Sequence, residues 1–236
     1  MVQPRNASTV VLLRPAANGA FEILLTRRPP QMKFLGGYYV FPGGAVHRDD
    51  YSSRVLDRCR GLSTNDARRI LGTDDNANQA LGHWVAIVRE LFEEVGVLLC
   101  LAESGDEIDL RDPQAKDRLE LKRQAIVRNE LDFGSFLESE KLLCDLSRAV
   151  YFDHWVTPEI YSMRFDTRFY IAKLPNNQIP LVASEEVMDS LWVKPQDALS
   201  RINRDDFPLL PPTTTVLAEL ARIGSWRGLQ DRFHLV

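Results

Sequence analysis

The chain has 236 residues, of which 44% are hydrophobic and 26% charged, and its formal net charge at pH 7 is −4. These values are ordinary for a globular protein with a sizeable core, organised as one large domain or two small ones. They exclude the strongly basic footprint of a nucleic-acid-binding domain, so we expect no nucleic acid as partner.

Signals for a membrane or an oxidising compartment are weak in this sequence. The apolar run near the N-terminus covers only Val10 to Leu13, which is too short for a secretion signal or a membrane span. The three cysteines, Cys59, Cys100 and Cys144, are far apart and odd in number. We therefore expect reduced thiols, a cytoplasmic location and no membrane partner.

Hydrophobic periodicity and turn residues predict strands interspersed with helices. Apolar runs at 8–15 and 21–28 form an expected hairpin, and a loop at 29–44 contains a short strand, 38–41. The elements expected after this loop are a helix at 62–72, a loop at 73–82, helices at 84–95, 112–133 and 136–150, extended chain at 150–158, a strand at 161–175, and helices at 195–199 and 213–224. This pattern predicts a layered fold of the α/β or α+β class.

The clearest helix, 84–95, runs into the stretch RELFEEVGV at residues 89–97. Its apolar residues recur at helical spacing and predict a buried stripe made of Trp84, Val88, Leu91 and Val95. At about 100° per residue, Glu90, Glu93 and Glu94 fall on the opposite side. Carboxylates at this spacing converge on one small patch, where they repel one another.

This carboxylate patch has two interpretations. Runs of glutamate are most often a solvated helix face. A divalent cation would instead turn the repulsion into coordination, because clustered hard oxygen ligands are what Mg²⁺ and Mn²⁺ select. Only Arg89, four residues before Glu93, is placed to neutralise the patch locally. Backbone carbonyls of the loop at Gly44 could join the ligands. We favour the cation site.

The same stretch resembles a known family. Residues 89–97 match REUxEExGU, with U an aliphatic residue, which is similar to the second half of the signature of Nudix hydrolases. The first half is matched by Gly44, followed after five residues by an acid, here Asp50 where the family has glutamate. Residues 51–88 separate this acid from the arginine, which corresponds to an insertion of about 31 residues within 51–82.

The resemblance implies a fold and a domain organisation. The expected fold is a Nudix-type α/β/α sandwich with a mixed central sheet and extra helices. Residues 1–236 would form a single Nudix hydrolase domain, with the insertion within 51–82 and a helical segment near 112–147.

The family pattern also implies roles for the residues of the patch. Glu90 and Glu94 are the expected direct ligands of Mg²⁺ or Mn²⁺, and the backbone carbonyl of Gly44 is another. Glu93 would ligate a further ion, orient water or act as the base. Arg89 would buttress Glu93 rather than touch the substrate.

A late acid often supplies the general base or a further ligand in this family. The candidates here are Glu186, favoured for its distance to Trp192, and its neighbour Glu185. The alternative for both is a pair of exposed acids at the end of a loop.

A narrower resemblance covers residues 24–44, LLTRRPPQMKFLGGYYVFPGG. Their spacing is similar to the signature of coenzyme A diphosphatases, and the long insertion resembles a branch of that group. Arg28 and Lys33 depart from the signature. If coenzyme A binds, Arg27, Arg28 or Lys33 would read its 3′-phosphate, whereas the alternative is a plain strand with solvated cations.

Three further residues are candidates for contacts with the substrate. Arg164 and Arg168 share one strand face and could meet phosphates, or could form a salt-bridged face with Asp166. Tyr39 could stack on an adenine, although aromatic residues beside strands more often belong to the core.

The leading interpretation is metal-dependent hydrolysis of coenzyme A or an acyl-CoA to (acyl-)4′-phosphopantetheine and adenosine 3′,5′-bisphosphate. A second keeps the chemistry but takes ADP-ribose, NADH or another dinucleotide. A third is a catalytically silent Nudix-like domain that binds a nucleotide and regulates a partner. The expected ligand is a small nucleoside diphosphate derivative, and the chain would be a monomer or a homodimer.

Overall fold

The computed structural model describes residues 2–32, 35–73, 76–184, 187–202 and 206–235. Its strands are β1 (Arg5–Pro15), β2 (Phe21–Arg27), β3 (Tyr39–Val40), β4 (Gly43–Ala45), β5 (Cys59–Arg60), β6 (Cys100–Ala102), β7 (Leu142–Asp145), β8 (Ala149–Val156), β9 (Phe165–Lys173) and β10 (Asp189–Val193). Its helices are α1 (Ser53–Leu56), α2 (Thr64–Leu71), α3 (Ala77–Val95), α4 (Pro113–Val127), α5 (Phe133–Ser139), α6 (Pro195–Leu199), α7 (Pro211–Ile223) and α8 (Trp226–Phe233).

The central sheet is mixed, as the sequence predicts. Within the described residues its main path runs β10-β2-β1-β9-β8, with β3 attached to β2 and β4 to β1. β1 pairs in parallel with β9 and antiparallel with β2 and β4. The apolar run from Val10 to Leu13 lies at this centre and is 0% exposed. Both of its faces are covered, which is why apolar and polar residues do not alternate there.

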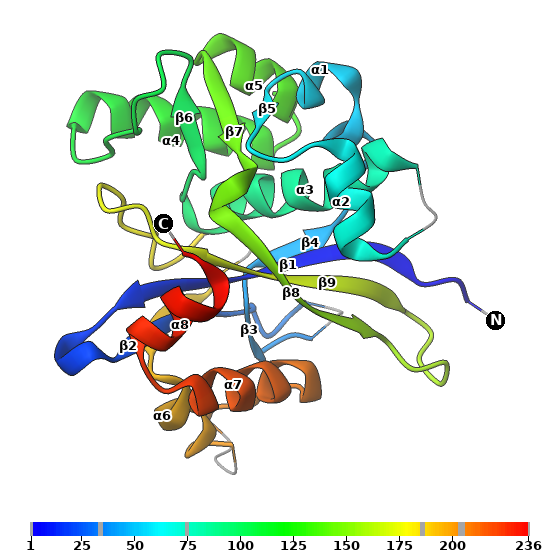
Figure 1. Ribbon diagram of the computed structural model, residues 1–236, viewed down its shortest axis with the longest axis vertical. Helices are drawn as coiled ribbons and strands as arrows, with labels where there is room; N and C mark the ends of the chain where they lie inside the picture. Colours follow the sequence, from blue (N-terminus) through cyan, green and yellow to red (C-terminus); the bar gives the residue numbers. More distant parts are fainter. Residues whose placement is uncertain (1, 33–34, 74–75, 185–186, 203–205, 236) are drawn as a thin grey trace.

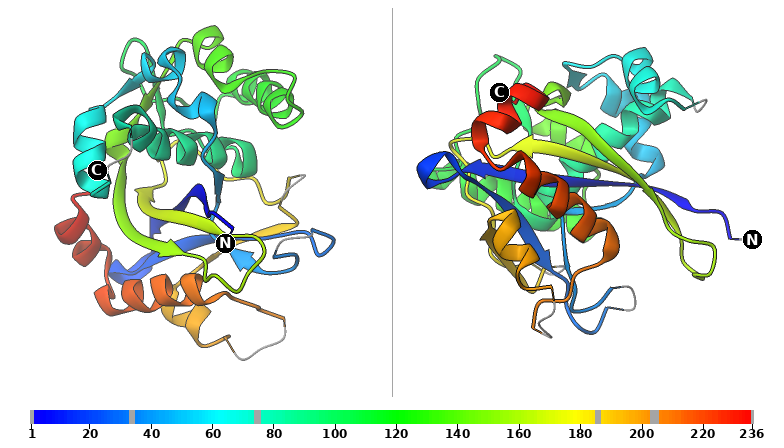
Figure 2. Two further views of the ribbon diagram at one scale, coloured as in Figure 1. Left: turned by 90° about the vertical axis from the view of Figure 1, so that its right-hand side faces the viewer. Right: turned by 60° about the horizontal axis from the view of Figure 1, so that its bottom comes forward.

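Helices cover both faces of the sheet (Figure 1, Figure 2). α3 crosses one face, with α1, α2, α4 and α5 beyond it, and α6, α7 and α8 cover the other face. Alternate residues of β1 feed two cores, because successive side chains of a strand point to opposite faces. Val10 and Leu12 pack with α3, whereas Val11 and Leu13 pack with α7. The expected α/β/α sandwich with extra helices is confirmed.

The inserted segment within 51–82 is structured. It folds into α1, β5, α2 and the first residues of α3, so the predicted helix at 62–72 is confirmed. The loop expected at 73–82 is wrong, because α3 begins well before residue 84. Its N-cap is Asn76, whose side chain accepts the backbone N–H of Asn78 at 2.8 Å.

The helix expected at 136–150 is the largest error of the sequence-based prediction. α5 ends at Ser139, Lys141 has a positive φ of 52°, and the chain then enters β7 and β8. Among the described residues, β7 joins β5 and β6 in a second sheet of three strands. Such long-range pairing overrides local periodicity. α8 was also not predicted, although Ser225 caps it by accepting the N–H of Gly228 at 3.1 Å.

The other expected strands and helices are confirmed, the helix at 195–199 with the expected bounds and the rest with shifted ends. They are the strands at 8–15, 21–28 and 161–175 and the helices at 84–95, 112–133, 195–199 and 213–224. Shifts of this kind are the usual uncertainty of element boundaries. In the part of the chain that the structure describes, no helix combines the length and the apolar character needed to cross a membrane.

Candidate functional site

The glutamate face of α3 is largely buried. Glu90 and Glu94 are 7% and 5% exposed, and Arg89 is 5% exposed. The opposite stripe is buried as well, since Trp84 is 2% and Leu91 0% exposed. Buried charges require partners or a bound ion. The face is therefore a built charge cluster, and a solvated helix face does not describe it.

Arg89 is the centre of this cluster. Its Nε donates to Asp50 Oδ1 at 2.8 Å and its Nη2 to Asp50 Oδ2 at 3.1 Å. Nη1 donates to Glu90 at 2.8 Å and to Glu93 at 3.0 Å, while Nη2 also reaches the carbonyl of Ala45 at 3.0 Å. Burial lowers the pKa of Arg89, but the surrounding carboxylates outweigh burial and raise it overall. The planar guanidinium group of Arg89 thus holds the surrounding carboxylates in fixed orientations, which is the supporting role expected for Arg89.

Asp50 belongs to this cluster although the whole inserted segment separates it from Arg89 in the sequence. It is 2% exposed, and its Oδ2 also accepts the backbone N–H of His47 at 2.8 Å. Asp50 and Arg89 are 39 positions apart in the sequence and yet form a bidentate pair. The inserted segment therefore leaves and re-enters the fold at adjacent points. The only signal for Asp50 in the sequence was its spacing after Gly44.

Gly44 places bare backbone against the Glu90 carboxylate. It lies on β4, opposite Ser8 of β1. A Cβ built on Gly44 would lie 2.5 Å from Glu90 Oε1, so the carboxylate fills the space that any side chain at this position would need. Burial raises the pKa of Glu90 to about 7, although the charge of Arg89 opposes this. Glu90 is therefore a buried oxygen donor held against the backbone of β4.

The described residues do not by themselves form a complete set of metal-binding side chains. No three His, Cys, Asp or Glu side chains among them converge as a ready metal site. Glu90 and Glu93 share Nη1 of Arg89, and Glu94 is buried on the same face. Buried carboxylates that gather on one helix face are nevertheless the hard oxygen donors that Mg²⁺ and Mn²⁺ select.

Two buried polar contacts hold α3 in place and were not anticipated. Ser8 Oγ and His83 Nδ1 are 2.9 Å apart, and both residues are at most 1% exposed. Arg123 of α4 donates from Nη1 to the backbone carbonyl of Glu93 at 2.6 Å, where a cation complements the C-terminal end of the helix dipole. His83 lies seven residues before Glu90, but neither its buried contact with Ser8 nor the contact of Arg123 follows from a local sequence pattern.

Arg27 and Tyr39, both proposed for substrate contacts, contact other groups of the protein. Arg27 donates from Nε to the carbonyl of Gly37 at 3.1 Å, and its guanidinium lies 5.4 Å from the centroid of the Tyr39 ring. Tyr39 is only 5% exposed and packs on Phe207 with ring centroids 4.5 Å apart. The placement of Tyr39 corresponds to the core alternative, because a ring so deeply packed offers little face to an adenine.

Of the other expected site residues, one is described by the structure and three are not. Arg28 follows β2 directly, and its backbone N–H donates to the carbonyl of Tyr38 at 3.0 Å. Lys33, Glu185 and Glu186 lie outside the described residues. Their roles as phosphate ligand or general base therefore stay predictions.

Arg164 and Arg168 both contact other parts of the protein. Arg164 donates to two backbone carbonyls at 3.0 and 2.8 Å. Arg168 is paired with Asp166, as the salt-bridge alternative expects. Arg168 is also the register partner of Ser8, which is the partner of Gly44. Of the two arginines, Arg168 therefore lies in the same cross-strand row as Gly44 of β4.

Known proteins are similar to the chain over most of its length. A family model described as the NUDT19 Nudix domain matches residues 4–223. The acyl-coenzyme A diphosphatase NUDT19 of Xenopus laevis is 28% identical over 228 residues, covering 85% of this chain and 60% of that protein. The putative nudix hydrolase 7 of Caenorhabditis elegans is 24% identical over 222 residues, covering 94% and 62% respectively. The chain thus spans 60–62% of the length of these two curated relatives.

A solved structure shares the whole architecture. The crystal structure of a NUDIX hydrolase from Alicyclobacillus acidocaldarius superposes with a TM-score of 0.78 at 29% sequence identity. The match covers 98% of this chain and 97% of that chain. Coverage of this extent includes the inserted segment, so a fold with these extra elements occurs in another protein.

Proposed function

The chain belongs to the Nudix hydrolase family, with a NUDT19-type Nudix domain over residues 4–223, and from this premise we propose that it hydrolyses a diphosphate linkage in a nucleoside diphosphate derivative. The observation that carries the proposal is the buried cluster around Arg89. There an acid from 39 positions earlier, Asp50, holds the arginine that orients Glu90 and Glu93. A module that only bound a nucleotide would have no use for carboxylates crowded in this way.

The glutamate face would hold Mg²⁺ or Mn²⁺ through Glu90, Glu94 and the carbonyl of Gly44, with Glu93 ligating a further ion or orienting water. Such an ion supplies polarisation of phosphoryl oxygens and a lowered pKa of water. Arg89 fixes the carboxylates of Glu90 and Glu93 beforehand, at 2.8 and 3.0 Å. Groups that are already oriented need no reorganisation during the reaction. This preorganisation is the source of much of the rate enhancement in polar active sites.

We propose coenzyme A or an acyl-CoA as the substrate, with (acyl-)4′-phosphopantetheine and adenosine 3′,5′-bisphosphate as products. Two observations support this choice: the Xenopus laevis relative is named an acyl-coenzyme A diphosphatase, and residues 24–44 resemble the coenzyme A diphosphatase signature. ADP-ribose and NADH contain the same kind of diphosphate bond and are the alternatives. Arg27 and Arg28 would read the 3′-phosphate, so 3′-dephospho-CoA should show a different kcat/KM.

The metal assignment is tested with Glu94→Gln and the matched control Glu130→Gln. Glu94 is buried on the active face, whereas Glu130 is exposed after α4. Glu94→Gln should lower metal-dependent kcat/KM by more than about 100-fold, and the control should keep it. Circular dichroism and thermal unfolding check that both variants fold. Unchanged turnover by a folded Glu94→Gln protein would overturn the assignment.

The substrate is tested with the unmodified chain and a panel of nucleotides. Coenzyme A, acetyl-CoA, ADP-ribose, NADH and diadenosine polyphosphates are incubated with Mg²⁺ or Mn²⁺, and products are separated by chromatography. Release of adenosine 3′,5′-bisphosphate from coenzyme A supports the proposal. Turnover of ADP-ribose or dinucleotides alone would overturn the substrate and keep the chemistry. Binding without any turnover would establish the silent regulator instead.

A further inference from the structure

The three cysteines form one row across the small sheet. Cys59 on β5 is the parallel register partner of Cys144 on β7, and Cys100 on β6 is its antiparallel partner. Residues directly opposite one another in a sheet project from the same face. The sulfurs of Cys100 and Cys144 are accordingly 3.9 Å apart. All three cysteines are free thiols.

Both neighbouring pairs have backbone spacing that a disulfide can bridge. Asp145 donates its N–H to the carbonyl of Leu99 at 2.9 Å, which makes the adjacent Cys100–Cys144 pair a non-hydrogen-bonded one. In such pairs the Cα atoms are about 4.5 Å apart, and neighbouring strands in general are about 4.8 Å apart. Disulfides span Cα distances of about 4.4–6.8 Å. Small side-chain movements would therefore join Cys144 to either neighbour.

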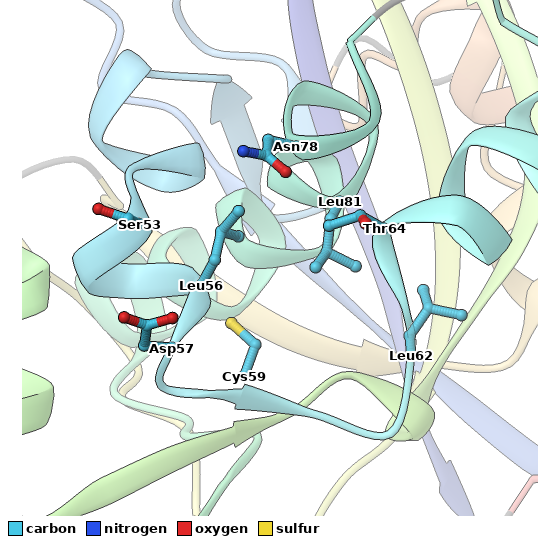
Figure 3. A pocket seen from close by; sticks show the side chains of 8 residues that line it. All are labelled: Ser53, Leu56, Asp57, Cys59, Leu62, Thr64, Asn78 and Leu81. Atoms are coloured by element: carbon cyan, nitrogen blue, oxygen red, sulfur yellow. The ribbon is translucent and has the colours of Figure 1, made fainter.

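Cys59 is the member of the row that a small molecule can reach. It lines a cavity of about 360 Å³ between α1, α2 and the start of α3, together with Leu56, Thr64, Asn78 and Leu81. Figure 3 shows its sulfur turned toward Leu56.

The other two thiols are sealed. Cys100 and Cys144 are 1% and 0% exposed, whereas Cys59 is partly exposed. A reagent that enters the cavity thus meets Cys59 first, and Cys144 lies directly behind it.

We propose that this row is a thiol–disulfide exchange site for low-molecular-weight disulfides, in which Cys59 attacks and Cys144 resolves. The Cys59 thiolate bonds to one sulfur of a disulfide RSSR, the RSSR bond breaks, and the departing thiolate takes up the proton that Cys59 released. Cys144 then attacks the Cys59 sulfur and expels the second RSH. One RSSR is reduced to two RSH, and two cysteine thiols are oxidised to one protein disulfide.

Cys100 gives the disulfide a second position. Its sulfur can attack Cys144, which returns Cys59 to the thiol form and leaves a disulfide in the sealed part of the sheet. This exchange among the three cysteines needs no further oxidant. The hydrogen bond with Cys144 and burial raise the pKa of Cys59, so little thiolate exists near neutral pH. The reaction should accelerate as the pH rises, because the thiolate is the nucleophile.

The test uses the unmodified chain of residues 1–236 and the small disulfide cystamine. Samples are quenched with acid at intervals, free thiols are alkylated, and intact mass and peptide maps are recorded. The unmodified chain should carry a transient half-cystamine adduct on Cys59 and then lose two hydrogen atoms as the internal disulfide forms. Adducts appearing first on Cys100 or Cys144, or no oxidation at all, would overturn the proposal.

Serine variants separate the steps. Cys144→Ser should keep the adduct on Cys59, because the resolving thiol is gone. Cys59→Ser should stay reduced over the same period, although Cys100 and Cys144 remain adjacent. Cys100→Ser is the matched control in the same row and should stop at a Cys59–Cys144 disulfide. Oxidation of Cys59→Ser as fast as the unmodified chain would refute entry through Cys59. The time course of the unmodified chain decides the matter even if a variant fails to fold.

Discussion

Replacing Gly44 with alanine should displace the Glu90 carboxylate with little other effect. A Cβ at this position would lie 2.5 Å from Oε1, 2.7 Å from Cδ and 2.8 Å from Oε2 of Glu90, and these are its three nearest atoms. Gly44 is not among the glycines with positive φ, so alanine is compatible with the backbone. The strain therefore falls on one side chain of the proposed cation site.

The size of the displacement follows from these distances. Ordinary van der Waals contact begins at 3.4 Å, so Oε1 must retreat by about 0.9 Å (3.4 − 2.5). Such a shift disturbs the 2.8 Å hydrogen bond from Arg89. Misplacing a catalytic group by about 1 Å costs on the order of 100-fold in rate, which corresponds to about 2.7 kcal/mol in the barrier. Overpacking costs about 1–3 kcal/mol of stability.

The assay is steady-state kinetics of Gly44→Ala with the substrate identified from the panel, together with calorimetric titration of Mg²⁺. Gly228→Ala is the matched control. It lies in α8 beyond the opposite face of the sheet, where the new Cβ would meet Ile223 Cγ2 at 3.0 Å. The control should keep its turnover and metal affinity. If Gly44→Ala also kept both, the contact between Gly44 and Glu90 would have no part in catalysis.

Three further perturbations test the cluster and its support. Asp50→Ala should lower the free energy of unfolding by about 3–5 kcal/mol, because Arg89 stays buried without its bidentate partner; unchanged stability in a urea titration would contradict this. Burial raises the pKa of Glu90 from 4.5 to about 7, so the metal-free folded state binds this proton more tightly than the unfolded state does. Stability should therefore fall by about 3 kcal/mol as the pH rises through this window, and urea titrations of Glu90→Gln should lack that slope. Phe136→Ala should lower the free energy of unfolding by about 3–5 kcal/mol, because Phe136 is 0% exposed and stacks on Phe92 of α3 with ring centroids 4.8 Å apart. A loss under about 1 kcal/mol, measured by thermal unfolding, would show that α5 does not stabilise α3.

Elements with local signals could be predicted from the sequence. α4 begins with Asp112 and Pro113, where the aspartate caps the helix and proline suits its first turn. α3 ends at Val95 and is followed by the C-cap Gly96, which adopts a positive φ of 69° that glycine tolerates. Such cues act within a few residues of the boundary, so no tertiary information was needed to read them.

Elements that depend on distant partners could not be predicted in this way. The start of α3 carries the polar residues Asn78 and Gln79, and Ala80 and Leu81 find their apolar partners only in the folded insertion. An amphipathic pattern therefore emerges only later in the helix. β7 is similar: its apolar residues fit a helix as well as a strand, and only β5 and β6, contributed by Cys59–Arg60 and Cys100–Ala102, decide between them.

The candidate site shows the same division. The spacing of Glu90, Glu93 and Glu94 placed the carboxylates together from periodicity alone. The pairing of Asp50 with Arg89 was accessible only through the resemblance to a family, because 39 positions separate the two residues. Buried polar contacts between distant elements, such as those of His83 and Arg123, have no local pattern at all.

The parallel pairing of β1 with β9 also means that the central sheet can be completed only late in translation. Arg5 pairs with Phe165, which is made 160 positions later (165 − 5). At about 5–20 residues per second, a ribosome needs on the order of 8–32 s for that stretch. Throughout this time the apolar run from Val10 to Leu13, 0% exposed in the finished fold, lacks one neighbouring strand. Unpaired apolar strand edges invite aggregation, so the nascent chain is a natural client for chaperones until most of it has been translated.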